Sequence, residues 1–133
     1  MRLVTSDYKK VVDVGTAPVW NSLYSTVKLR VSGKLDEESN EILFFLQTGE
    51  CKKENLSKTL TGMKQVQKIL KEVDAKDFVY DYRHLEKKAP WKINEAILSC
   101  AELYTTSEGK NLLDETIDLL EYACDNNIEI FVD

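Results

Sequence analysis

Residues 112–127 read LLDETIDLLEYACDNN, and this stretch decides how the rest of the chain must be arranged. Apolar residues recur through it at helical spacing, which predicts an amphipathic helix with a broad side that needs a cover. We expect the helix to end at Asn126-Asn127, because asparagine tolerates the left-handed conformation that follows many helices. Its apolar set is Leu112, Leu113, Ile117, Leu119, Leu120, Ala123 and Cys124.

The opposite side of this helix is acidic. Its carboxylates are spaced by four, three and four residues, so they fall in one line, the acidic stripe: Asp114, Asp118, Glu121 and Asp125. Like charges at this spacing destabilise a helix by about 0.2–0.5 kcal/mol per pair. Two interpretations are open. In the first, the stripe has a structural role only: it is solvated, or it pairs with Lys64, Lys68 and Lys71 within the fold. In the second, it is a docking face for a basic partner, with Tyr122 as a further contact.

Charge is unevenly distributed along the chain. Residues 1–94 carry 17 Lys and Arg against 13 Asp and Glu, whereas residues 95–133 carry Lys110 against ten acids. The last third of the chain is therefore expected to build an acidic surface, which would repel the phosphates of nucleic acid. We accordingly expect a protein partner and no direct contact with nucleic acid.

The stretch YTTSEGKNLL, residues 104–113, contains a Gly-Lys pair ahead of the helix. A phosphate-binding loop requires G-x-x-x-x-G-K followed by Ser or Thr, but Tyr104 and Asn111 occupy two of the defining positions. The hydroxyl groups instead predict helix capping. Thr105 and Glu108 have the spacing of a capping box, and Ser107 is an alternative cap.

The remaining patterns predict an α+β fold in one domain spanning residues 1–133. Residues 2–14 form a strand or one arm of a hairpin, and residues 78–83 and 128–132 alternate like strands. Further helices are expected from Val19 to Val31 after Pro18, from about Asp36 to Gly49 with Glu37 and Glu38 in the first turn, and over residues 53–73. Residues 93–104 fit a short helix, with an alternative strand at 103–106. The sum is three or four helices packed on a small, mainly antiparallel sheet.

Enzyme chemistry finds little support in the sequence. His84 is the single histidine and has no neighbouring nucleophile, while Cys51, Cys100 and Cys124 lie far apart without metal-ligand spacing. We therefore expect no catalytic residues, no metal and no cofactor. Three separated thiols, no apolar run of about 20 residues and no signal peptide favour a cytoplasmic protein without membrane contact.

Trp91 follows Pro90 in the loop at residues 87–91. Such a tryptophan can stack on a ligand, but it more often packs a loop onto the core. We include Trp91 among the residues that could contact a partner.

Four motifs in this order resemble immunity protein family seventy of bacterial polymorphic-toxin systems. They are GTAPVWNSLYSTV at 15–27, KILKEV at 68–73, DYRHLEKKAPW at 81–91 and YTTSEGKNLLDETIDLLEYA at 104–123. The resemblance covers nearly the whole chain. It offers no catalytic or toxin-binding residues to transfer, so the acidic stripe remains an inference from charge.

The resemblance implies a cytoplasmic antidote that is encoded with a secreted toxin, as in contact-dependent growth inhibition. Many such toxin domains are nucleases, including RNA-cleaving ones, whose clefts are basic. An acidic inhibitor could occupy the place of nucleic acid without doing chemistry. The alternative is an adaptor or self-associating module that binds another basic protein.

Overall fold

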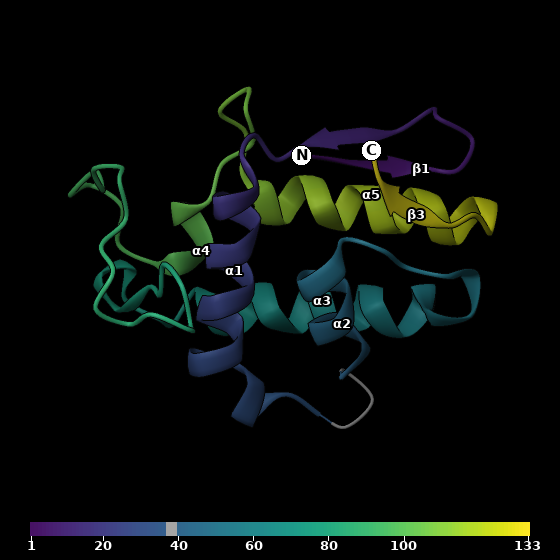
Figure 1. The fold of residues 1–133 in the computed structure, drawn as a ribbon. Coiled ribbons are helices and arrows are strands. Elements are labelled where there is room, and N and C mark those ends of the chain that lie inside the picture. The colour runs from purple at the N-terminus through teal and green to yellow at the C-terminus, as the bar shows by residue number, and fades with distance from the viewer. Residues whose placement is uncertain (37–39) are drawn as a thin grey trace.

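The computed structural model describes residues 1–36 and 40–133. Helix α5 (Leu112–Asn126) lies in the middle of the molecule, between the strands near the termini and helix α3 (Leu56–Leu70), as Figure 1 shows. α3 runs along α5, and strand β2 (Val11–Asp13) also contacts it. The apolar side predicted for α5 is therefore covered from two directions.

The sheet has the strand order β2-β1-β3, with β1 (Arg2–Thr5) in the centre and β3 (Ile130–Val132) as the second edge. Both pairs are antiparallel, and Leu3 lies opposite Val12 on one side and Val132 on the other. The two ends of the chain thus meet in neighbouring strands (Figure 1). The first segment, expected to be a strand or one arm of a hairpin, forms both arms of a hairpin, β1 and β2. The closing strand is confirmed.

Helices α1 (Ala17–Arg30) and α2 (Glu41–Thr48) pack against each other. Pro18 lies in the first turn of α1, as expected. α2 begins later than its predicted start at Asp36, which is not helical, and Glu37 and Glu38 lie outside the described residues. α2 does end at Gly49, where φ is +77° and an added Cβ would lie 2.5 Å from Val132 Cγ2.

Short elements join the main ones. A 3-10 turn, η1 (Ser32–Lys34), follows α1; η3 (Lys53–Asn55) leads into α3; η4 (Ala75–Asp77) follows it; and α4 (Cys100–Leu103) precedes α5. The helix expected over residues 53–73 is therefore partly 3-10 helix and ends at Leu70. The ambiguous segment at 93–104 is helical only in α4.

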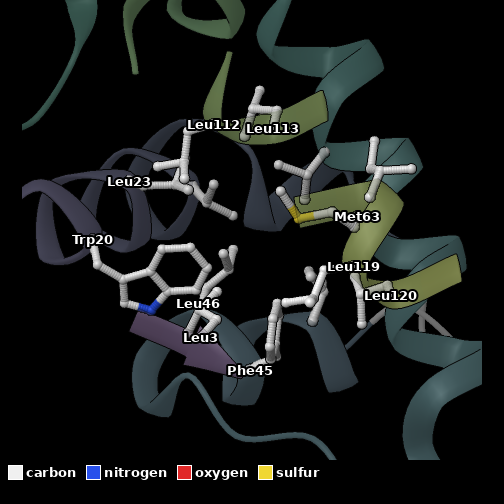
Figure 2. Packing of buried hydrophobic residues seen from close by; sticks show 14 of the residues in the cluster. Leu3, Trp20, Leu23, Phe45, Leu46, Met63, Leu112, Leu113, Leu119 and Leu120 are labelled. Carbon is white, nitrogen blue, oxygen red and sulfur yellow. The ribbon is translucent and has the colours of Figure 1, made fainter. Parts of the chain in front are cut away.

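The core lies where α1, α2, α3, α5 and β1 converge (Figure 2). The Trp20 ring meets the Phe45 ring edge to face, with centroids 5.6 Å apart. Met63 of α3 faces the leucines of α5 in the same cluster. Every apolar residue of α5 counted from the sequence is buried except Cys124, which is half-buried.

The fold class is confirmed: helices pack on a small antiparallel sheet. The described part of the chain contains no helix with the length and apolar character needed to span a membrane.

The strand predicted over residues 78–83 is wrong, and hydroxyl groups of α1 explain why. The Val79 carbonyl accepts hydrogen bonds from Ser22 Oγ at 2.8 Å and Thr26 Oγ1 at 3.2 Å, and the Val79 amide donates to Thr26 Oγ1 at 2.8 Å. The Tyr82 amide donates to Ser25 Oγ at 3.0 Å. Side chains of a helix thus satisfy backbone groups that a neighbouring strand would otherwise bind.

A buried tyrosine completes this hydroxyl network. Tyr104 OH lies 2.9 Å from Ser22 Oγ and 2.8 Å from Thr26 Oγ1. Burial raises the pKa of Tyr104 above its ordinary value, so the hydroxyl stays neutral and can donate. The network joins α1, the 79–82 segment and the turn before α5.

Thr26→Val is expected to lower the free energy of unfolding by about 1–3 kcal/mol, because the buried Val79 amide loses its acceptor. Urea unfolding measures the change.

Thr116→Val is the matched control. Thr116 is equally buried, but its hydroxyl donates only to the Leu112 carbonyl of its own helix. We expect a loss below about 1 kcal/mol. Equal losses of unfolding free energy in the two variants would show that the hydrogen bonds between Thr26 and Val79 stabilise the protein no more than a bond within a helix does.

Candidate functional site

Helix α5 is capped at both ends. The Asn111 side chain accepts a hydrogen bond from the Asp114 amide at 3.0 Å and donates one to the Ala101 carbonyl at 2.9 Å. Asn127 ends the helix in the left-handed conformation, with φ +49°. The bond from Asn111 to Ala101 ties the first turn of α5 to α4.

Asn111 replaces the residues predicted to cap the helix. Thr105 and Glu108 do not form a capping box, and Ser107 does not cap α5. The hydroxyl that binds a backbone amide in this turn belongs to Thr106, which accepts a hydrogen bond from the Lys110 amide at 3.2 Å. Residues 105–111 instead form a tight turn with an isolated bridge between Thr105 and Asn111.

All four carboxylates of the acidic stripe are exposed, in line with the predicted spacing. Two of them are engaged by α3: Gln67 Nε2 donates to Asp114 Oδ1 at 2.6 Å, and Lys64 Nζ lies 3.7 Å from Glu121 Oε1. Among the described residues, Asp118 and Asp125 have neither a hydrogen bond nor an ion pair to their carboxylates.

Pairing within the fold therefore describes Asp114 and Glu121, whereas Asp118 and Asp125 remain solvated. Lys64 pairs within the fold as one interpretation requires, but the described residues give no such pairing for Lys68 or Lys71. The Lys64–Glu121 pair is about half exposed, so it stabilises the protein by less than about 1 kcal/mol. Half of the stripe stays available to a partner.

Tyr122 lies on the hairpin side of the stripe. Its hydroxyl donates to Asp7 Oδ2 at 2.7 Å, and Lys10 Nζ lies 5.9 Å from the centre of its ring. The hydrogen bond from Tyr122 lowers the pKa of Asp7, so this carboxylate remains charged at neutral pH. The hairpin contacts were not predicted from sequence, because they join residues more than a hundred positions apart.

Trp91 does not join the stripe. It belongs to the segment between η4 and α4, which lies beyond α1 at the end of the molecule away from α5 (Figure 1). Its ring is half-buried and meets Tyr80 edge to face, with centroids 5.1 Å apart. The predicted contact residues thus divide between two separate surfaces.

His84 and the three cysteines show no arrangement typical of a catalytic or metal site among the described residues. His84 is exposed, and its Nδ1 lies 3.7 Å from Glu86 Oε1. Burial raises the pKa of all three thiols, that of Cys100 to about 12, so they remain protonated at neutral pH. The described residues contain no group of three or more His, Cys, Asp and Glu side chains placed to hold a metal ion.

The chain is a small α+β domain in which α5 presents an exposed row of carboxylates. The chain matches the family model described as Immunity protein 70 over residues 4–132, and it belongs to that family. The family implies an immunity protein that acts on a toxin protein, and thus an inhibitor. Neither a curated protein nor a solved structure matches the chain.

Asn111→Ala is expected to destabilise the protein by about 1 kcal/mol, because α5 loses its N-cap. Thermal or urea unfolding measures this.

Ser107→Ala and Thr105→Ala are the matched controls, and we expect each to change the free energy of unfolding by less than about 0.5 kcal/mol. A larger loss for Thr105→Ala than for Asn111→Ala would restore the predicted capping box.

Proposed function

We propose that this protein is the cytoplasmic immunity partner of a secreted toxin domain of a contact-dependent growth inhibition system. The toxin is a nuclease, with RNA as a candidate substrate. The immunity protein inhibits it without catalysis, by covering its basic substrate cleft with the acidic stripe. It binds the toxin domain and not the nucleic acid.

The observation that carries this proposal is the unpaired state of Asp118 and Asp125 on an anchored helix. Both are exposed, and they occupy the side of α5 opposite the core. A rigid row of carboxylates resembles a phosphate backbone in charge. It would raise the rate of encounter with a basic cleft and compete for the same cations.

The arrangement is unfavourable for α5 itself. Asp114 with Asp118, and Glu121 with Asp125, place like charges one turn apart. Asp125 also lies in the last turn, where the helix dipole disfavours an acid and where no basic residue compensates. A cost to stability at a binding surface is common, because such surfaces are selected for function.

The double variant Asp118→Lys with Asp125→Lys should therefore change stability and binding in opposite directions. We expect the free energy of unfolding to rise by about 1 kcal/mol, from relief of repulsion and a better dipole match. Association with the toxin domain encoded beside this chain should slow by about tenfold or more at low salt. Stopped-flow binding and urea unfolding measure the two effects.

The control is Asp36→Lys with Glu72→Lys, which changes the net charge equally at exposed positions outside α5. Its association rate should remain within about twofold of the unsubstituted protein. If both double variants associate as fast as the unsubstituted protein, the stripe is not the docking surface. A nuclease assay of the toxin domain with and without the immunity protein tests the substrate assignment.

A further inference from the structure

A second concave surface lies in the segment that carries Trp91. It is a groove with a volume of 440 Å³, large enough for one or two side chains of a partner. Its wall is apolar and aromatic, with Phe78, Tyr80, Trp91 and Ile93, and three cations line it as well: Arg30, Lys87 and Lys88. Within the described part of the chain, no acidic side chain lines this groove.

The charge around the groove is opposite to that of the acidic stripe. Residues 83–92 read RHLEKKAPWK, with four Lys and Arg against Glu86. Lys87 and Lys88 are exposed and make no ion pair among the residues described. The groove therefore attracts anionic groups, and it repels the basic surface that the stripe would bind.

The walls of the groove are held in place before any partner arrives. The hydroxyl network of α1 fixes Val79 on one side of Tyr80, and Ser25 fixes Tyr82 on the other. Arg30 Nε donates to the Asp77 carbonyl at 2.9 Å, which positions its guanidinium. A preorganised surface loses less conformational entropy on binding.

Apolar surface is exposed at and near the groove. Leu85, which lines it, is 69% exposed, and Leu98 in the same segment is 75% exposed. Tryptophan, tyrosine and arginine, the residue types that most often dominate binding energy at interfaces, are all present in the lining. A cavity of this composition fits an apolar anchor side chain surrounded by polar contacts.

We propose that this groove is a second docking site for the same toxin domain, and that it binds an acidic segment carrying an apolar anchor residue. The proposal rests on the proposed function, because the occupant belongs to the toxin. Charge complementarity selects the occupant: the groove offers three cations and no acid, so it requires a segment with the opposite charge. Two sites of opposite sign would also define the orientation of the toxin and reject partners that match only one of them.

Two variants test the groove. Trp91→Ala removes an aromatic side chain from its wall, and the double variant Lys87→Glu with Lys88→Glu reverses the charge of its two exposed lysines. We expect Trp91→Ala to speed dissociation from the toxin domain by about tenfold. The double reversal should slow association by about threefold or more at low salt, with the effect fading as salt rises. Unfolding transitions of both variants show that the fold is kept.

Lys52→Glu with Lys53→Glu is the matched control. These adjacent exposed lysines precede and begin η3, and they do not line the groove. We expect unchanged binding.

The outcomes separate the two proposals. If the α5 variant loses binding while both groove variants bind like the unsubstituted protein, the groove proposal fails and the proposed function stands. If Trp91→Ala weakens binding but Lys87→Glu with Lys88→Glu does not, the segment bound in the groove is not acidic and the proposal is wrong on that point. If Trp91→Ala alters only the sedimentation of the free protein, the occupant is a second copy. If the unsubstituted protein does not bind the toxin domain, both proposals fall together.

Discussion

The packing of α5 against α3 and β2 is the contact on which the rest of the structure depends. Seven residues of α5 are buried, and each large apolar side chain contributes about 1.5–3 kcal/mol on burial. Repulsion along the acidic stripe costs only about 0.2–0.5 kcal/mol per pair. The buried side therefore outweighs the strain on the exposed side by a wide margin, and the helix can carry unpaired carboxylates without losing its position.

Charge is separated over the molecule. α5 carries the exposed row of acids, whereas the segment between η4 and α4, at another end of the molecule (Figure 1), carries exposed cations. α1 connects the two regions, because Ser22 and Thr26 hold Val79 while Leu23 and Val27 pack in the core. α1 therefore links the segment that forms the groove to the core that carries the acidic stripe.

Apolar periodicity predicted α1, α3 and α5, because each has one side that must be buried. It also predicted the exposure of the acidic stripe. The alternation of residue types at 78–83 predicted a strand that does not form. Tyr80 and Tyr82 belong to a loop whose hydrogen-bond partners lie on a helix more than fifty residues earlier.

Contacts distant in sequence account for the other failures too. The missed cap at Asn111 is the exception, because its signal is local: Asn111 directly precedes the helix, and its side chain accepts from the Asp114 amide three residues later. The division between paired and free carboxylates depends on Gln67 and Lys64, whose register against α5 cannot be read from spacing within either helix. The groove is lined by both Arg30 and Trp91, which are sixty-one positions apart, and no local pattern places them on one surface.

Carboxylate labelling of the complex tests the docking surface most directly, because it needs no substitution. Carbodiimide coupling of an amine, read by mass spectrometry, reports the accessibility of each Asp and Glu with and without the toxin domain. The acidic stripe predicts that labelling of Asp118 and Asp125 falls sharply in the complex, while Asp36, which lies beside Gln65 and not on α5, is labelled as before. Unchanged labelling of Asp118 and Asp125 in a fully formed complex would contradict the account.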